Sequence, residues 1–176
     1  MAKKVYKANA LSVSDMRKLA DDLRKYADSL EYKARLLAEK LSERGVEIAR
    51  VRIADLDAIF TGELLSSIHS EYKGSFKGGG IFMVVADSSH ALFVEYGTLG
   101  SMGGKKEYPY PFPEGISWEY GSGKTIHLRN GEYGWWYPKN GKWYWSSGMD
   151  ARPFMMETAV TIHSIVAKTA KEIFSK

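Results

Sequence analysis

The residues of this chain that could do chemistry are few and lie far apart. Gly121-Ser122-Gly123-Lys124-Thr125 is similar to the end of a phosphate-binding loop. The full motif needs a glycine five residues before its Gly-Lys pair and a helix after it, whereas this chain has Trp118 at that position and continues with residues typical of a strand. We therefore interpret residues 121–124 as a turn between two short strands, Ile116–Tyr120 and Thr125–Arg129.

Metal, cofactor and nucleophile chemistry also have little support. The histidines lie on separate expected elements, without the paired spacing of a zinc site: His69, His90, His127 and His163. The chain has no cysteine, which excludes disulfides, thiolate ligands and a cysteine nucleophile. It also lacks the G-x-S-x-G turn of serine hydrolases and the glycine-rich turn of dinucleotide sites. We expect no metal, no cofactor and no enzymatic activity.

Glu95 is the one carboxylate within an apolar run, residues 90–98. Two interpretations are open. Glu95 could be a perturbed acid, which would make the chain a hydrolase that needs this residue. Alternatively, it is a buried structural residue, held by backbone N–H groups or by an arginine such as Arg152. We favour the second interpretation because a buried charge needs partners of this kind.

Residues 135–146 form the clearest hairpin, because Asn140-Gly141 suits a tight type I′ turn. The two-residue turn pairs Trp136 with Trp145, Tyr137 with Tyr144 and Pro138 with Trp143. One face would then carry Trp136, Pro138, Trp143 and Trp145, and the other Trp135, Tyr137 and Tyr144. Both faces cannot easily be core, so we predict an aromatic patch that is exposed or covered by a partner. Because such surfaces stack on sugars and bases, a module that binds polysaccharide or single-stranded nucleic acid is an alternative function.

Two short stretches organise the rest of the chain. Residues 90–98 read HALFVEYGT, an apolar run that we expect to be buried and to turn sharply at Gly97. Residues 150–155 read DARPFM, where Pro153 suits the first turn of a helix and Arg152, before a proline, marks its boundary. Together with TGELLSSI at 61–68 and the Trp-rich segment before Gly148, they resemble, in the same order, bacteriophage tail-component proteins of the tail-completion or head–tail joining kind.

The resemblance implies a non-enzymatic phage or prophage protein of the neck, a minor tail protein that completes the tail or joins it to the head. Such proteins act as closed rings, commonly sixfold. The implied partners are other copies of the chain, the tail-tube protein and head-connector proteins, and the implied location is the virion, after assembly in the host cytoplasm.

The resemblance also suggests roles for particular residues. The motif residues would fix a buried turn and the start of the last helix beside it: Phe93, Val94, Glu95, Tyr96, Gly97, Thr98, Arg152, Pro153 and Phe154. Contacts with other subunits or with the tail tube would come from the loop 99–115 and the hairpin, through Tyr108, Tyr110, Phe112, Trp136, Trp143 and Trp145.

The composition is that of an ordinary globular protein, with 44% apolar and 26% charged residues among 176, and we expect one domain over residues 1–176. The net charge of +4 is spread along the chain, with no basic cluster beyond the first seven residues, so we do not expect direct binding to nucleic acid. The basic N-terminal arm, residues 1–12, has no apolar signal-peptide core, and no apolar run approaches the roughly 20 residues of a membrane helix. We therefore expect neither secretion nor a membrane span.

Apolar residues spaced by three and four predict a long amphipathic helix from Ser12 or Ser14 to about Arg44, ended by Gly45. We expect this helix to cover the core, or to pack part of its apolar stripe against a neighbouring subunit. Residues 46–60 fit a strand or a helix, and we favour a helix. The last helix should run from Pro153 to about Phe174 and bury Met155, Ala159, Ile162, Val166, Ala170 and Ile173.

Between these helices we expect strands. Alternation predicts a strand from Glu63 to about residue 73, and the run 81–86 predicts a central strand buried on both faces. Residues 87–89 should cap a short helical turn that leads into the motif. The predicted fold class is therefore α+β, with an antiparallel sheet packed against the long N-terminal helix and the C-terminal helix.

Overall fold

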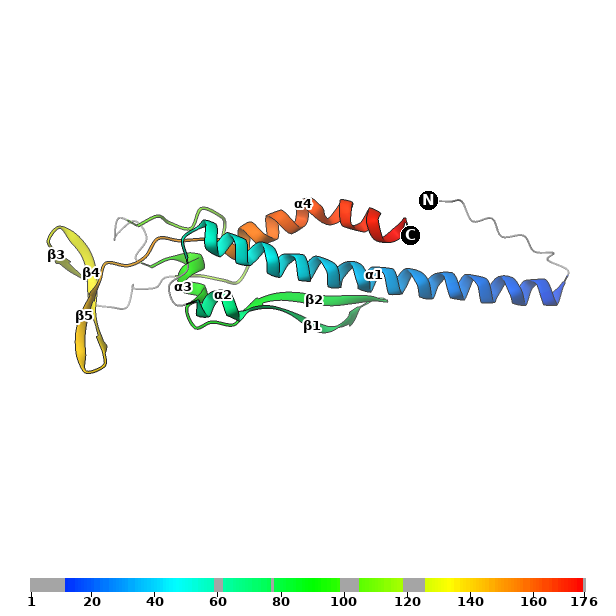
Figure 1. Ribbon diagram of the computed structural model, residues 1–176, viewed down its shortest axis with the longest axis horizontal. Helices are drawn as coiled ribbons and strands as arrows, with labels where there is room; N and C mark the ends of the chain where they lie inside the picture. The colour runs from blue at the N-terminus through cyan, green and yellow to red at the C-terminus, as the bar shows by residue number, and fades with distance from the viewer. Residues whose placement is uncertain (1–11, 59–61, 77, 99–104, 119–125, 176) are drawn as a thin grey trace. The chain divides into compact units, whose positions relative to one another are not determined.

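The computed structural model describes residues 12–58, 62–76, 78–98, 105–118 and 126–175 (Figure 1). The helices are α1 (Val13–Asp55), α2 (Glu63–Ser67), α3 (Ala91–Tyr96) and α4 (Phe154–Phe174). The strands are β1 (Ile68–Phe76), β2 (Gly79–Ala86), β3 (His127–Arg129), β4 (Glu132–Lys139) and β5 (Lys142–Ser146). A long N-terminal helix, a C-terminal helix and antiparallel strands confirm the α+β class. None of the helices in the described ranges is long and apolar enough to cross a membrane.

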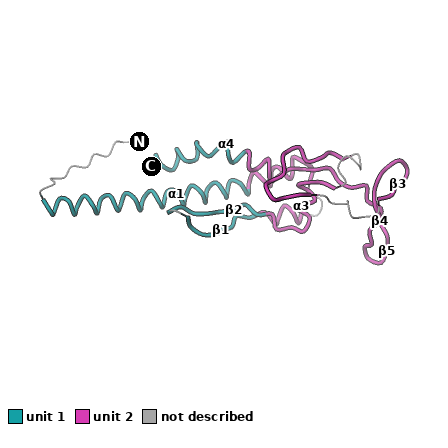
Figure 2. The backbone as a smooth tube through the Cα atoms, turned by 180° about the vertical axis from the view of Figure 1, so that it is seen from behind, with its two compact units in different colours: residues 1–46, 69–85, 161–176 teal, residues 47–68, 86–160 magenta. Residues whose placement is uncertain are grey.

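Backbone contacts divide the chain into two compact units (Figure 2). Unit 1 consists of residues 1–46, 69–85 and 161–176, and unit 2 consists of residues 47–68 and 86–160. The chain passes between the units several times, so neither unit is a continuous stretch of sequence.

Helix α1 begins where the sequence predicts and ends later. The Ser12 hydroxyl accepts the N–H of Asp15 at 3.3 Å, and the Ser12 carbonyl accepts the N–H of Met16 at 3.0 Å, as expected of an N-cap. The predicted end at Gly45 is wrong, because the helix continues to Asp55 and includes the segment from residue 46 that we expected to be a separate helix. At 1.5 Å per residue this helix is roughly 65 Å long.

Gly45 has a packing role inside unit 1. A Cβ atom at this position would lie 2.6 Å from Val84 Cγ2 and 2.8 Å from Ile162 Cδ1. The Val84 side chain on β2 and the Ile162 side chain on α4 therefore occupy the space that a side chain at position 45 of α1 would need. A glycine inside a helix costs about 1 kcal/mol relative to alanine, and the close packing here offsets that cost.

The unit 1 sheet consists of β1 and β2 and lies against α1. Ser42 and Ser70 hydroxyls lie 2.7 Å apart, and the Arg35 guanidinium lies 4.9 Å from the centre of the Tyr72 ring. The prediction that residues 81–86 are buried on both faces is wrong, because Ile81 and Met83 are 44% and 46% exposed. The predicted strand from Glu63 is wrong in its first five residues, which form α2.

The buried stripe predicted for α4 is correct at Ile173 and wrong at other positions. The buried side chains of α4 are Phe154, Thr158, Thr169 and Ile173, whereas the predicted Ala159 and Val166 are exposed. The threonines tolerate burial because each hydroxyl has a partner. Thr158 Oγ1 donates to the Phe154 carbonyl at 2.7 Å, and Thr169 Oγ1 accepts from Arg44 at 2.6 Å.

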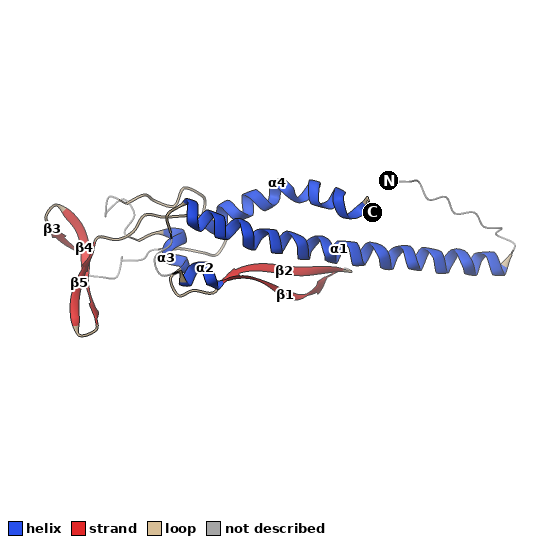
Figure 3. Cartoon of the chain, in the orientation of Figure 1, coloured by secondary structure: helices blue, strands red, loops and turns tan. Residues whose placement is uncertain are grey.

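The unit 2 sheet has the order β3-β4-β5 (Figure 3). The predicted hairpin register is confirmed, with Trp136 opposite Trp145, Tyr137 opposite Tyr144 and Pro138 opposite Trp143. Asn140 and Gly141 have φ angles of 52° and 72°, as a type I′ turn requires. The predicted strand 116–120 is wrong for residues 116–118, which are not in a strand, and residues 119–125, with the predicted Gly-rich turn, lie outside the described residues.

Candidate functional site

The structure brings the two motif stretches together inside unit 2. The Arg152 N–H donates to the Val94 carbonyl at 2.8 Å. The Thr98 N–H donates to the Met149 carbonyl at 2.9 Å, and the Met149 N–H donates to Thr98 Oγ1 at 2.8 Å. Two backbone hydrogen bonds and one to the Thr98 side chain thus hold α3 and Thr98 beside the residues that lead into α4. This confirms the prediction that the last helix begins beside the first motif.

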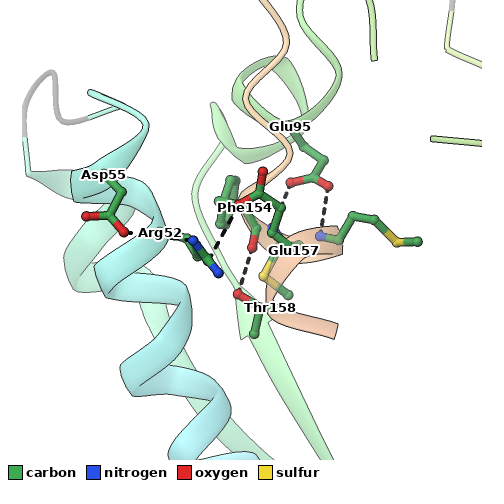
Figure 4. A network of polar contacts seen from close by, with 8 residues as sticks. Arg52, Asp55, Glu95, Phe154, Glu157 and Thr158 are labelled. Carbon is green, nitrogen blue, oxygen red and sulfur yellow. Dashed lines mark hydrogen bonds and ion pairs between the residues drawn. The ribbon is translucent and has the colours of Figure 1, made fainter. Parts of the chain in front are cut away.

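Glu95 lies at the centre of this junction and is 5% exposed. Its carboxylate accepts the N–H of Met155 at 2.8 Å and the N–H of Met156 at 3.1 Å (Figure 4). The Tyr108 hydroxyl donates a longer bond of 3.4 Å. The N–H groups in the first turn of a helix have no hydrogen-bond partners within that helix. Here a carboxylate side chain from α3 provides those partners. The predicted role of Glu95, held by backbone N–H groups, is confirmed, and Arg152 contacts the motif through its own backbone.

Burial raises the pKa of Glu95 above its usual value. The N–H groups of Met155 and Met156 and the Tyr108 hydroxyl oppose this shift, and the negative charge of Glu157 adds to it. Glu157 is itself paired with Arg52 at 3.5 Å, and Arg52 also lies 3.9 Å from Asp55 (Figure 4). Because Glu95 is buried and both of its oxygens accept backbone bonds, this arrangement suits a structural carboxylate rather than an acid that meets a substrate.

Gly97 makes the turn that allows the two stretches to meet. Its φ angle is 72°, in the region that favours glycine, and its N–H donates to the Phe93 carbonyl at 2.9 Å. A Cβ atom here would lie 2.7 Å from Ala151 N and 2.9 Å from Met149 O. Two features therefore exclude a side chain at this position: the positive φ angle, and the backbone atoms of Met149 and Ala151 beside it.

An aromatic cluster covers the junction. Tyr96 is the central ring, with Tyr108, Phe112 and Trp118 at centroid distances of 4.8, 5.4 and 5.6 Å. Tyr110 packs on Tyr108 at 5.7 Å. Burial raises the pKa values of Tyr96 and Tyr108 above their usual range. The loop aromatics that we predicted as assembly contacts therefore pack on the motif, although Phe112 remains 43% exposed.

Sequence reasoning missed two residues of this junction. The Trp118 indole N–H donates to the Gly97 carbonyl at 2.8 Å, and the Trp118 ring packs edge-on against Phe93 at 5.4 Å. The Lys106 N–H donates to the Asp150 carboxylate at 2.9 Å, and the Lys106 carbonyl accepts from Ala151 at 2.9 Å. The many aromatic residues after residue 107 could have indicated that Trp118 joins this cluster. Lys106 contributes only its backbone N–H and carbonyl, so its residue type gives no indication of these hydrogen bonds.

The hairpin of β4 and β5 carries the other predicted residues. Trp136, Trp143 and Tyr144 are 43%, 66% and 41% exposed, whereas Trp135 on the same strand is 7% exposed. Trp145 is half-buried and packs edge-on against Trp136 at 5.4 Å. The Arg129 guanidinium lies over the Trp136 ring at 4.9 Å. One chain therefore leaves a surface of rings open, with an arginine stacked on it.

The described histidines lie on β1, before α3, on β3 and on α4, and no group of three or more metal-ligating side chains occurs in the described ranges. Unit 2 contains a cavity of about 850 Å³ whose lining includes Glu63, His90, Arg152 and, from β4, Tyr137 to Lys139. Comparison of the chain with protein-family models, curated proteins and solved structures found no match.

Proposed function

We propose that this protein is a structural component of a phage or prophage particle, at the head-proximal end of the tail. Copies of the chain form a ring that completes the tail or joins it to the head. The protein acts through association alone, and no bond is made or broken.

The observation that carries the proposal is the junction of the two motif stretches. Two of the stretches that carry the resemblance to tail-completion proteins, residues 90–98 and 150–155, are far apart in the sequence. In this chain those stretches bind one another through Glu95, Val94 and Thr98. These two motif stretches therefore form one structural unit, as expected if the family keeps them to build this junction.

Two exposed surfaces support a role in assembly. The hairpin exposes tryptophan and tyrosine rings, which are enriched at the centres of protein interfaces. The first half of α1 exposes large apolar side chains, among them Met16, Leu23 and Tyr26. Large exposed apolar surfaces mark sites of interaction with partners.

The test is electron microscopy of lysates from a phage or induced prophage that lacks this gene. We expect filled heads beside unattached or misshapen tails, and normal particles when the wild-type gene is supplied in trans. The same gene with Trp143→Ala and Trp136→Ala should restore particles less well, while its product stays folded. Intact, infectious particles without the gene would overturn the proposal.

The exposed hairpin also favours a second candidate, a module that binds polysaccharide or single-stranded nucleic acid. Rings flanked by an arginine can stack on sugars or bases, and Arg129 lies over Trp136. Titration of tryptophan fluorescence with oligosaccharides and with single-stranded DNA distinguishes the candidates. Saturable quenching that Trp143→Ala abolishes would favour the binding module, and its absence would favour assembly.

A further inference from the structure

The first half of α1, residues 13–32, which we call the exposed α1 segment, has an apolar stripe that is largely exposed among the residues that the structure describes. Every described side chain from Asp21 to Asp28 is exposed. Met16, Leu23, Tyr26 and Leu30 are between 36% and 47% exposed. In Figure 1 this segment runs beyond the sheet of β1 and β2 and beyond the end of α4. Most helices in proteins are stabilised by packing of their apolar face, so we expect this stripe to pack against a partner.

The spacing of the stripe is that of helices that pack side by side. Met16, Leu23 and Leu30 recur every seven residues, as do Leu19 and Tyr26 between them. This alternation of three and four residues is the pattern of a coiled-coil seam. Val13, Ala20 and Ala27 extend the apolar face along one side of the seam, which makes it broader than a two-helix seam needs. A broad face suits a helix with a neighbour on each side.

The charges beside the stripe indicate the identity and direction of those neighbours. Asp15 and Asp22, seven residues apart, flank one side of the seam. Arg17 and Arg24, also seven residues apart, flank the other side beyond the alanines. Parallel copies place the arginine flank of one helix against the aspartate flank of the next, whereas antiparallel copies place like charges together. Arg24 is free to change partners, since its ion pair with Asp21 at 3.1 Å joins two exposed side chains.

We infer that the exposed α1 segment packs in parallel against the same segment of neighbouring copies of this chain. The inference rests on the proposed function, in which copies form a ring, and it names the surface through which they meet. In a ring with cyclic symmetry each copy uses two different surfaces, one for each neighbour. The aspartate flank and the arginine flank of α1 supply two such surfaces.

Sedimentation velocity of the full chain over a wide range of concentration tests the inference. We expect the wild-type protein to form species larger than a dimer as its concentration rises. Leu23→Gln with Leu30→Gln should keep the protein monomeric at the same concentrations. The matched control is Asp21→Gln with Asp28→Gln on the opposite side of the helix, which should associate like the wild type. Circular dichroism should show the same helix content in all three proteins.

Disulfide cross-linking tests the direction, because the chain has no cysteine of its own. Met16→Cys and Leu30→Cys variants are oxidised separately and as a mixture. Parallel packing predicts that each variant cross-links to itself and that the mixture gives few products joining position 16 to position 30. Abundant mixed products, or no cross-linking at either position, would overturn the inference.

The results separate this inference from the proposed function. A wild-type protein that is monomeric throughout, or one whose association survives Leu23→Gln with Leu30→Gln, overturns the α1 contact. The microscopy of lysates without the gene tests the function independently of that contact. Intact particles there would overturn the tail function even if copies of the chain associate through α1.

Discussion

At the scale of single residues, the junction depends on one buried carboxylate and one glycine. Glu95 binds the first N–H groups of α4, and Gly97 allows the chain to turn against Met149 and Ala151. Both residues act on backbone atoms, so the identity of the side chains opposite them matters little. This explains how a short motif can position a helix that begins more than fifty residues later.

Glu95 should make stability depend on pH. Its pKa is raised in the folded protein by burial, so the folded state binds this proton more tightly than the unfolded state. Stability should therefore fall as the pH rises from the usual glutamate pKa, about 4.3, through the raised value. Urea unfolding of the wild type and of Glu95→Gln across this range isolates the effect, because the variant cannot titrate at this position. A wild-type stability that rises relative to the variant over this range would contradict the pKa shift.

Gly97→Ala should destabilise the protein far more than Gly141→Ala. Both glycines have a φ of 72°, but a Cβ at Gly141 meets nothing within 4 Å, whereas at Gly97 it meets the backbone of residues 149 and 151. The positive φ alone costs about 1–2 kcal/mol, and the collision at Gly97 should at least double that loss. Thermal and urea unfolding measure both variants. Equal losses of stability in the two variants would show that the backbone of residues 149 and 151 moves to make room for the new Cβ atom.

Much of this junction was predictable from residue types. An isolated acid in an apolar run had to find donors, and the stretch 150–155 offered the start of a helix that could supply them. The part played by Lys106 was not predictable, because it contributes backbone atoms. The packing of Tyr108 and Phe112 on Tyr96 was not predictable either, because a sequence does not show whether a ring finds a partner in its own chain. Their role as assembly contacts stays a prediction.

At the scale of elements, the hairpin of β4 and β5 and the helix α1 each have one part that is packed and one part that is exposed. The hairpin buries Trp135 and exposes Trp143, and α1 packs from about Glu31 onwards, whereas most described side chains of its first half are exposed. Each element thus contributes to the fold through one portion and offers the other portion to partners.

Trp135→Ala and Trp143→Ala should have opposite consequences. Trp135 is 7% exposed, so its loss should cost about 3–5 kcal/mol of folding free energy. Trp143 is 66% exposed, so its loss should change stability by no more than about 0.5 kcal/mol while weakening association. Urea unfolding measures the stability of both variants, and electron microscopy of lysates complemented with each variant gene measures assembly. A large loss of stability in Trp143→Ala would place the hairpin in the core.

Local signals predicted the elements well where they were strong. The Asn140-Gly141 turn fixed the hairpin register, because a two-residue loop leaves one pairing. The helix end predicted at Gly45 was wrong. A glycine after a helical pattern usually ends the helix. Here the side chains of Val84 and Ile162 lie so close to α1 that a glycine is needed within the helix. The burial of Thr158 and Thr169 on α4 was also missed, because the hydrogen-bond partners of these hydroxyls appear only in the folded chain.

At the scale of the whole molecule, the described chain is a scaffold with open surfaces. Each compact unit has its own buried residues, and each carries an exposed apolar or aromatic surface among its described residues, the first half of α1 in unit 1 and the hairpin in unit 2. Such surfaces are costly in a monomer and useful in an assembly. The predicted single domain remains a prediction, since the contacts define units without testing whether either folds alone.

The melting temperature of the full chain should rise with protein concentration. Copies that associate only when folded stabilise the folded state by mass action. Differential scanning calorimetry at several concentrations should show the increase for the wild type and none for Leu23→Gln with Leu30→Gln. A concentration-independent melting temperature in the wild type would mean that copies do not bind one another before unfolding.

The most direct test of the central claim is immunogold electron microscopy of particles that carry an epitope-tagged copy of the protein. The account predicts gold at the junction between head and tail on infectious particles, and none on particles with the untagged protein. Gold at the distal end of the tail would contradict the proposed position. Purified particles without label, from lysates that contain the soluble tagged protein, would contradict a role in the virion.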